Sequence, residues 1–397
     1  MSATAESVQV IASDEEAVTA AAEFAEAIRP GAIARDFNAT LPHDELRDLA
    51  ATGLLGIRVP RAYGGAGVSN ATVAEVFRLI AVADPAVAQI PQNHVAFVDT
   101  IIRYGSDVQR AFFMAEFLRG ARLGNALSER GGKTSRDFVT RLTRRPDGTY
   151  RLDGRKYYST GALTAQWIPV FALDERREIA VAYVPRDAPG VHVDQDWDTF
   201  GQRSTISGTT TLEDVFVEPL WVIHRALARP EPNTFAAFGQ LIHVAVDVGI
   251  ARGALEDGAA FLRERARPWF EAGVDRAADD PHLLRLAGEL EVDVRAAEAL
   301  LARAGEALDE ADAGGDVTEA RLAVAAAKAF AGEAALRVST AIFDFSGSSA
   351  ADRRHGLDRH WRNARTHTLH DPARSKHVHL GRHVVDGVAP PPGHALI

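Results

Sequence analysis

The sequence predicts an α+β fold in which helices come first and last and a small β domain lies between them. Apolar residues recur at helical spacing up to about residue 120, short alternating runs follow to about residue 223, and long helical periodicity then returns. Alternating β and α units do not occur, which disfavours a doubly wound nucleotide-binding fold. We expect an N-terminal helical domain over residues 1–120, a central antiparallel β domain over 121–228 and a C-terminal helical bundle over 229–397.

Helices in the N-terminal part are indicated by apolar residues at every third or fourth position. The segments that show this spacing are Ala17–Ile28, Asp44–Thr52, Thr72–Ala83 and Val95–Tyr104. Between the second and third segments, Tyr63-Gly64-Gly65-Ala66-Gly67 superficially resembles a phosphate-binding loop. No strand leads into it, so we interpret it as a tight turn.

The central part changes to short runs of β-forming residues. These runs are Tyr150–Leu152, Lys156–Thr160, Val170–Ala172 and Ile179–Val184. Turn signals separate them, including Pro146-Asp147-Gly148 and Asp153-Gly154. A small antiparallel β domain is the expected result.

Two apolar seams dominate the C-terminal part. The first follows alternating steps of four and three through Leu283, Ala287, Leu290, Val294, Ala297, Leu301 and Ala304, and a second runs from Leu322 to Phe343. Asp280 before Pro281 is a favourable N-cap with proline at the first helical position. Such seams predict a helical bundle and are also suited to oligomerisation.

Composition excludes several classes of protein. The absence of cysteine rules out disulfide frameworks, thiolate zinc sites, iron–sulfur clusters and a cysteine nucleophile. The net charge of −10, without a basic stripe, makes nucleic acid an unexpected partner. Met1–Glu16 lacks the pattern of a signal peptide, and we expect no apolar run of the roughly 20 residues that span a bilayer. These features predict a soluble cytoplasmic protein without a membrane partner.

Four sequence blocks occur in an order that resembles the acyl-CoA dehydrogenase superfamily. They are Leu41–Gly67, Gly124–Glu129, Leu152–Ala162 and Asp196–Thr210, and the resemblance extends over roughly residues 15 to 390. It implies an acyl-CoA dehydrogenase-like fold and a flavin cofactor. In family members the second to fourth blocks contact the flavin.

The residues of these blocks make chemical sense for a flavin, because its flat apolar ring has a polar pyrimidine edge. That edge needs amides and hydroxyls, and an aromatic wall suits the ring. The resemblance therefore implies a flavin site containing Asn125, Ser128, Ser159, Thr160 and Trp197. The alternative is that the hydroxyls only end strands and Trp197 only packs.

The flavin phosphate and the choice of flavin depend on two further segments. Arg267 is a candidate phosphate ligand, since a guanidinium fork suits a phosphate, although an exposed surface arginine fits the same sequence. The stretch Phe345-Ser346-Gly347-Ser348-Ser349 keeps one glycine where family members that bind FAD carry a Gly-Gly turn. This favours FMN, while FAD stays an alternative.

The C-terminal segment is rich in histidine, and Asp358–Pro372 resembles the superfamily's active-site segment. In acyl-CoA dehydrogenases a glutamate here removes the substrate proton, whereas this chain has the shorter Asp371 directly before a proline. His367 and His370 lie three residues apart, but no acidic pattern such as HExxH accompanies them, so no metal is expected. Solvated helix histidines are the other interpretation.

The ending His367-Thr368-Leu369-His370-Asp371-Pro372 resembles the monooxygenase branch of the superfamily typified by dibenzothiophene monooxygenase. His94 falls where that branch has another active-site histidine, and Val98 stands where it has a tyrosine. The resemblance implies a C4a-hydroperoxide formed from O2 and reduced flavin, and oxygenation of a small hydrophobic organosulfur or nitrogen compound. His370 and His94 would stabilise the hydroperoxide or transfer protons, with His367 in support.

The resemblance also implies the partners, which are a flavin reductase that supplies FMNH2 or FADH2 and three further copies of the chain in a homotetramer. Two other functions stay open at this point. One is a divergent acyl-CoA dehydrogenase with Asp371 as the base. The other is a flavin-binding homologue without catalytic activity.

Overall fold

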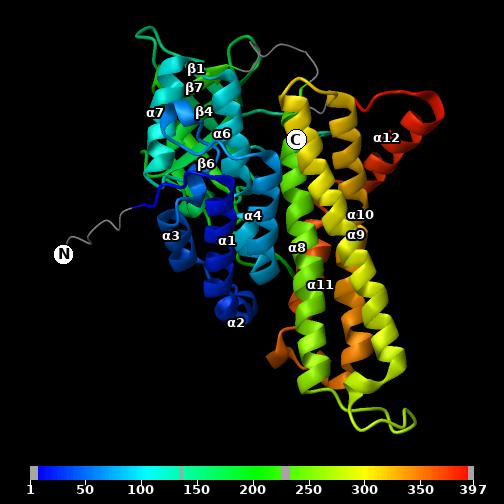
Figure 1. The fold of residues 1–397 in the computed structure, drawn as a ribbon. Coiled ribbons are helices and arrows are strands. Elements are labelled where there is room, and N and C mark those ends of the chain that lie inside the picture. The colour runs from blue at the N-terminus through cyan, green and yellow to red at the C-terminus, as the bar shows by residue number, and fades with distance from the viewer. Residues whose placement is uncertain (1–7, 135–136, 225–232, 392–397) are drawn as a thin grey trace.

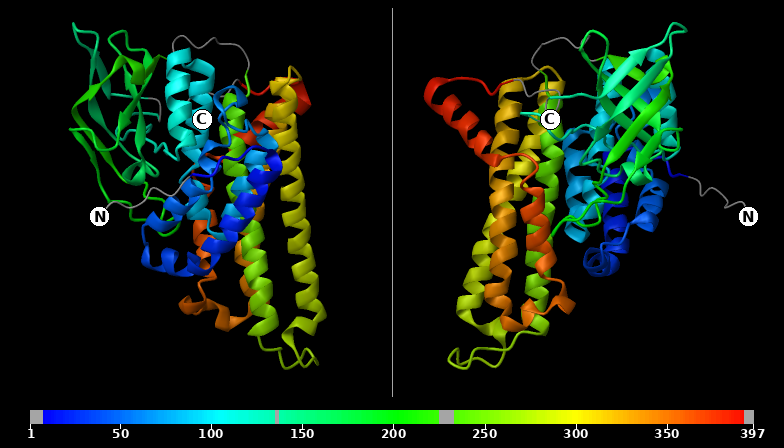
Figure 2. Two further views of the ribbon diagram at one scale, coloured as in Figure 1. Left: turned by 60° about the vertical axis from the view of Figure 1, so that its left-hand side comes forward. Right: turned by 180° about the vertical axis from the view of Figure 1, so that it is seen from behind.

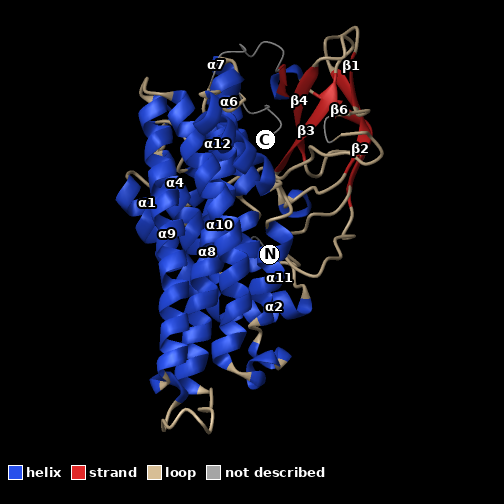
Figure 3. Ribbon diagram, turned by 90° about the vertical axis from the view of Figure 1, so that its right-hand side faces the viewer, coloured by secondary structure: helices blue, strands red, loops and turns tan. Residues whose placement is uncertain are grey.

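The computed structural model describes residues 8–134, 137–224 and 233–391 of the chain. Helices form the N-terminal part, a single sheet the middle and long helices the C-terminal part (Figure 1). The sheet lies along one flank of the helical body, as the view in Figure 3 shows. The predicted α+β fold is therefore confirmed.

The N-terminal part contains more helices than the periodicity indicated. They are α1 Asp14–Ile28, α2 Ala32–Asn38, α3 His43–Ala51, α4 Asn70–Ala83, α5 Pro85–Gln89, α6 Gln92–Tyr104 and α7 Asp107–Leu118. The four predicted segments correspond to α1, α3, α4 and α6. Ser13, Ser69 and Ser106 accept backbone N–H groups at the starts of α1, α4 and α7, which satisfies donors that have no partner within the helix.

The central part is a seven-stranded sheet with the order β5-β6-β2-β1-β3-β4-β7. Its strands are β1 Arg141–Arg144, β2 Tyr150–Lys156, β3 Trp167–Leu173, β4 Ile179–Pro185, β5 Val191–Val193, β6 Thr210–Val217 and β7 Val222–His224. The pairing of β1 with β3 is parallel, and the other pairings are antiparallel. The sheet is thus mixed, not purely antiparallel as expected.

The predicted strand Lys156–Thr160 is wrong beyond its first residue. β2 ends at Lys156, and Tyr158 has a φ of 56°, in the left-handed region. The chain turns there and leaves the sheet. A left-handed tyrosine is strained, and such strain concentrates at functional sites.

The C-terminal part is the predicted helical bundle. Its helices are α8 Phe235–Glu264, α9 Pro281–Asp312, α10 Val317–Ser346, α11 Asp358–His367 and α12 Ala373–Asp386. The seam residues Leu290, Val294 and Leu301 are buried, and Asp280 caps α9 by accepting the N–H of His282. α12 projects from the bundle away from the sheet (Figure 2).

α8 is the central helix of the molecule and packs against α4, α9 and α10. By length and composition it meets the criteria for a membrane-spanning helix, with a mean hydropathy of 1.3 in its most apolar window. That window is 89% buried inside the protein, as in the core helix of a soluble protein. α8 is apolar because other helices pack against it on several sides and exclude water from them.

The predicted domain boundaries stay predictions. α7 ends at Leu118 and the first bridge to the sheet is made by Leu123, so residue 120 falls in the connection between helix and sheet. The second boundary, at residue 228, lies outside the described residues.

α8 and α4 approach closely at Gly249, and this contact gives the first prediction. A Cβ at Gly249 would lie 2.5 Å from Ala81 Cβ and 2.7 Å from Arg78 O, whereas Gly288 on α9 has no such neighbour within 4 Å. We expect Gly249→Ala to destabilise the protein by about 1–3 kcal/mol through overpacking. Gly288→Ala should stabilise it by about 0.5–1 kcal/mol, because alanine favours a helix over glycine. Thermal unfolding of both variants checks this, and equal effects would contradict it.

Candidate active site

A group of polar side chains lies in the interior where α8 meets α10, α11 and the turn after α11. We call it the histidine cluster; it consists of Gln89, Gln240, His243, Asp247, Lys328, His367, His370 and Asp371. Gln240, His243 and Asp247 follow the spacing i, i+3 and i+7 on α8, which places them on one helical face. The apolar N-terminal half of α8 therefore carries one polar stripe toward α10 and α11.

An ion pair of Asp247 with Lys328 is the innermost part of the histidine cluster. Lys328 Nζ lies 2.9 Å from Asp247 Oδ2, and His367 Nδ1 lies 2.5 Å from Asp247 Oδ1. All three side chains are buried. Burial opposes the charge, but the Lys328 ammonium and the N–H of His367 together lower the pKa of Asp247 to about 2. Asp247 is therefore an ionised acceptor that holds a proton on His367 Nδ1.

His367 and His243 face each other through ring nitrogens. His367 Nε2 lies 3.2 Å from His243 Nδ1 and 3.1 Å from Gln89 Oε1. Burial lowers the pKa of both histidines, and for His243 the neighbouring His370, His367, Lys328 and Lys376 lower it further. Both imidazoles are thus neutral near pH 7.

His370 and Asp371 form the outer end of the cluster. The His370 ring contacts His243 with centroids 4.1 Å apart and planes tilted by 35°, and its Nδ1 lies 3.0 Å from Asp371 Oδ2. Gln240 Nε2 donates to the same oxygen at 2.8 Å. Against the effect of burial, His370 and Gln240 hold the pKa of Asp371 well below its usual range. A carboxylate so stabilised is a weak base.

His243, His370 and Asp371 also offer three ligand atoms within 4.8 Å of one another, which raises the question of a metal ion. The two imidazole rings have centroids 4.1 Å apart and planes tilted by 35°. His370 Nδ1 and Gln240 Nε2 already contact Asp371 Oδ2, so two of the three side chains satisfy each other. The expectation of no metal here stays a prediction.

The predicted catalytic residue His94 lies on α6, outside the histidine cluster. The Leu123 N–H donates to its Nδ1 at 3.1 Å, so the ring proton lies on Nε2, which donates to the Leu55 carbonyl at 2.8 Å. Burial, together with the charge of Arg122, lowers the pKa of His94 to about 4. In this arrangement both ring nitrogens tie α6 to backbone groups, and the predicted role in proton transfer stays a prediction.

The predicted flavin residues of the sheet domain gather where β2 leaves the sheet. The Tyr157 N–H donates to the Ser128 carbonyl at 2.8 Å, and Asn125 Nδ2 donates to the Tyr158 carbonyl at 3.3 Å. Thr160 Oγ1 is hydrogen-bonded to Ser207 Oγ at 2.8 Å. One turn thus assembles three of the sequence blocks.

Several buried polar atoms around this turn have no hydrogen-bond partner within the described residues. They are Asn125 Oδ1, Ser159 Oγ and the side-chain amide atoms of Gln92 and Gln202. An unsatisfied buried polar atom costs roughly 1–3 kcal/mol, so such a group indicates a place that receives a polar molecule. Amide and hydroxyl groups of this kind fit the pyrimidine edge of a flavin.

Trp197 and Arg267 differ in their relation to this turn. Trp197 makes an edge contact with Tyr158 and donates from Nε1 to the Gln202 carbonyl at 2.8 Å, so it belongs to the same region. Arg267 is exposed in the segment between α8 and α9. That segment lies at the end of the bundle far from the sheet (Figure 1). Within a single chain, Arg267 therefore does not lie beside the other predicted flavin residues.

We call residues 157–161, where the chain leaves β2, the flavin turn. The loop before β6 connects this turn to the histidine cluster. The Gln202 N–H donates to Asn363 Oδ1 on α11 at 2.6 Å. Gly201 packs so closely on α11 that a Cβ there would lie 1.9 Å from the Arg362 carbonyl oxygen. Since α11 also carries His367, this contact brings the two predicted groups of residues together.

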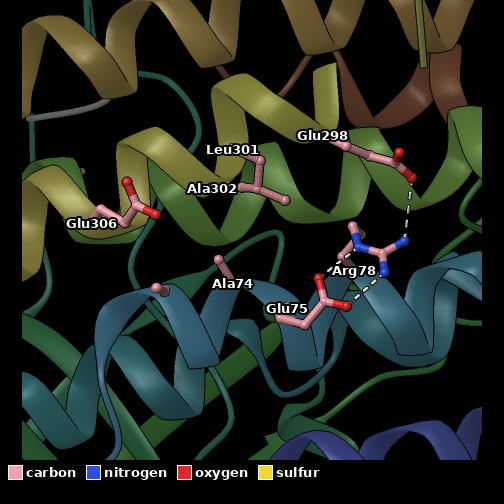
Figure 4. Close-up of a pocket in the computed structure, with 8 residues that line it drawn as sticks. Ala74, Glu75, Arg78, Glu298, Leu301, Ala302 and Glu306 are labelled. Carbon is pink, nitrogen blue, oxygen red and sulfur yellow. Dashed lines mark hydrogen bonds and ion pairs between the residues drawn. The ribbon is translucent and has the colours of Figure 1, made fainter. Parts of the chain in front are cut away.

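A separate cavity of about 360 Å³ lies between α4 and α9 (Figure 4). Alanines, Leu301 and the side chains of Glu75, Arg78, Glu298 and Glu306 line it, and Arg78 pairs with Glu75 and Glu298. No residue of the histidine cluster or the flavin turn lines this cavity. Its ion pairs are internal to α4 and α9, so it has no part in the candidate site.

Sequence reasoning missed Gln89, Gln240, His243, Asp247 and Lys328. The available signal was the polar stripe of Gln240, His243 and Asp247 within an apolar helix, because a buried charge on such a face needs a partner. Gln89 and Lys328 give no comparable local signal.

Known proteins match this chain along most of its length. Family models described as the N-terminal, middle and C-terminal domains of acyl-CoA dehydrogenase match residues 12–121, 124–215 and 241–374. Dibenzothiophene monooxygenase from Rhodococcus erythropolis is 35% identical over 96% of each chain. A probable FMNH2-dependent monooxygenase, SfnC from Pseudomonas putida, is 31% identical over 95% of this chain and 96% of its own. FMN-bound TdsC from Paenibacillus sp. A11-2 is 31% identical, covers 95% of this chain and 99% of its own, and superposes with a TM-score of 0.89.

The burial of His94 predicts a pH dependence of stability. Its pKa falls from 6.5 to about 4 on folding, so between these values the unfolded chain binds a proton that the folded protein does not. The contribution of the buried neutral imidazole to the free energy of unfolding is full above pH 6.5. It is lost as pH falls toward 4, and the loss is about 3 kcal/mol in all. His94→Gln should reduce the pH slope of the unfolding free energy by about one proton in this window. Urea unfolding at several pH values measures the slope, and an unchanged slope would refute the assignment.

The buried ion pair gives a prediction of its own. Lys328→Met leaves the Asp247 charge unpaired in the core, and we expect a loss of about 3–5 kcal/mol. Adding Asp247→Asn should recover part of this loss. The control is Arg285→Met, which breaks the exposed pair with Glu289 and should cost less than about 1 kcal/mol. Thermal unfolding compares the three, and similar costs for Lys328→Met and Arg285→Met would contradict the prediction.

Proposed function

The chain belongs to the acyl-CoA dehydrogenase family, and from this membership we propose that it is an FMN-dependent monooxygenase. It uses reduced flavin and O2 to oxygenate a small hydrophobic organosulfur or nitrogen compound. Two relatives, which are 35% and 31% identical and match this chain over nearly their whole length, are named as monooxygenases.

The observation that carries this proposal is the state of Asp371, which stands where dehydrogenases of the family have their base. Asp371 is bound to His370 and Gln240, and its pKa lies below the usual range. A general base works best with a pKa near the operating pH. The imidazole of His370, which contacts Asp371, and that of His243, which contacts His370, can each both accept and donate a proton. This favours proton exchange by imidazole over removal of a substrate proton by Asp371.

FMN as the cofactor is supported by the unpartnered polar atoms at the flavin turn and by the FMN bound to TdsC. Asn125, Ser128, Ser159 and Thr160 would hold the pyrimidine edge. Trp197 would form the aromatic wall of the site, close to Tyr158. When bound, reduced FMN supplies the two electrons with which O2 gives one oxygen atom to the substrate and one to water.

The histidines hold and move protons in this proposal. His370 is partly exposed at the outer end of the histidine cluster, where it can exchange a proton with a bound molecule. His367 supports it through His243, and Asp247 fixes the His367 proton on Nδ1. His94 keeps α6 in place beside this region and is included among the candidate catalytic residues.

Assembly and partners are inferred from surfaces and relatives. No residue of α12 is buried, and Val384, Val385 and Val388 at its end are exposed. Such a surface suits a subunit contact in a homotetramer, in which Arg267 of one subunit would reach the flavin phosphate of another.

A reductase that supplies FMNH2 is the expected protein partner, by analogy with the FMNH2-dependent relative. The expected location of the enzyme is the cytoplasm.

The test uses ¹⁸O2, a flavin reductase with FMN, and dibenzothiophene or indole as probe substrates. We expect one ¹⁸O atom in each product molecule. His370→Ala should lower the rate by about 10²–10⁴-fold, the usual contribution of an acid–base group. The matched control is His377→Ala, an exposed histidine on α12, which should leave the rate unchanged. Reduction of bound FMN by an acyl-CoA without oxygen or reductase would instead establish the dehydrogenase alternative.

A further inference from the structure

His243 is the one member of the histidine cluster that is fully buried and still has a free ring nitrogen within the described part of the chain. It lies on α8, with Nδ1 facing His367 Nε2 at 3.2 Å. Its Nε2 is buried and has no hydrogen-bond partner. A buried polar atom without a partner costs free energy unless a bound molecule satisfies it.

The contacts determine which nitrogen of each ring carries the proton. Asp247 is an ionised carboxylate, so His367 Nδ1 donates to it. Neutral His367 then has a lone pair on Nε2. Gln89 Oε1 lies 3.1 Å from the same atom, so the resting state requires the Gln89 amide to be turned with its NH2 group toward that lone pair. His243 Nδ1 is the ring atom that faces this lone pair, and it must therefore carry the proton of neutral His243. As a result His243 Nε2 is an acceptor.

We propose that His243 is a further catalytic residue, whose Nε2 exchanges a proton with a molecule bound at the histidine cluster while Nδ1 exchanges one with His367. This role rests on the function proposed above. It goes beyond His370 and His367, because it gives the active site a proton acceptor that is shielded from water on α8.

The step balances as a relay of one proton. The O–H bond of a bound donor breaks as an N–H bond forms at His243 Nε2. At the same time the N–H bond at Nδ1 breaks and its proton moves to His367 Nε2. His367 becomes an imidazolium that donates from Nδ1 to Asp247 Oδ1 and from Nε2 to the His243 Nδ1 that has lost its proton. The reverse sequence returns the proton to the oxygen atom that leaves as water. No electron is transferred in either direction.

The surroundings of His243 explain why it relays a charge and does not keep one. His370, His367, Lys328 and Lys376 all oppose a positive charge on it. The carboxylates of the cluster contact other groups, since Asp247 pairs with Lys328 and His367, and Asp371 with His370 and Gln240. His243 is therefore neutral at rest, and a positive charge is best accommodated on His367.

The first experiment examines the resting proton without flavin. Magic-angle-spinning ¹⁵N NMR of the full-length protein, labelled in its histidine rings, separates protonated from unprotonated nitrogens. The variant His243→Asn identifies the signals of His243. At neutral pH we expect a proton on Nδ1 and none on Nε2. A proton on Nε2 would overturn the proposal, because that atom would then be no acceptor.

The second experiment compares His243→Asn with His360→Asn. Asparagine keeps an amide donor near the position of Nδ1 but has no atom at Nε2. His360 is a matched control. It is also buried, it lies on the part of α11 away from the cluster, and its Nε2 lies 2.8 Å from Asp257 Oδ2 on α8. We expect His243→Asn to bind FMN normally and to lower the oxygenation rate about 100-fold or more, with a changed pH profile because solvent must exchange the proton in place of His243. His360→Asn should keep the wild-type pH profile.

His243→Gln provides a second variant if the asparagine protein does not fold. Glutamine reaches the position of Nε2 with an amide, which forms hydrogen bonds but does not relay protons, so the same loss is expected. Wild-type rate and pH profile in either folded variant overturn the role of His243. A wild-type protein that forms no ¹⁸O-labelled product overturns the proposed function instead, so the two failures are distinct.

Discussion

The buried negative charge of Asp247 is the constraint on which the arrangement of the bundle depends. A carboxylate on an apolar core helix must be paired, because desolvation of an unpaired charge costs several kcal/mol. Its partners come from two other helices, Lys328 on α10 and His367 on α11. The pairings fix how α8 and α10 are rotated about their axes and where α11 must end. The turn with His370 and Asp371 follows directly from that end.

The sequence predicted those features that have a local signal. Helical periodicity and the Asp280 cap located α9 and α10, and the four ordered blocks indicated the fold. The parallel pairing of β1 with β3 has no such signal, because it depends on which distant strands become neighbours. The alternating pattern also ran on through Tyr158, although the backbone turns there into the left-handed region.

The candidate site shows the same division. His367, His370 and Asp371 were found because they lie in one short segment that resembles a known one. His243, Asp247 and Lys328 come from two helices, and only the tertiary packing brings them to His367. The site also has two halves of different character. The sheet side keeps unpartnered amides and hydroxyls, which suits binding, whereas most polar groups of the histidine cluster already satisfy one another, which suits moving a proton.

The apolar surface of α8 has a consequence for how the chain is made. On a ribosome that adds roughly 5–20 residues per second, Phe235–Glu264 emerges seconds before Val317–Ser346, the helix that later covers one of its sides. An apolar helix left bare for that time is prone to aggregate. The close contact at Gly249 and Gly253 is made with α4, which has been synthesised long before. The N-terminal helices thus provide an early shelter for α8 in the nascent chain, before the bundle around it is complete.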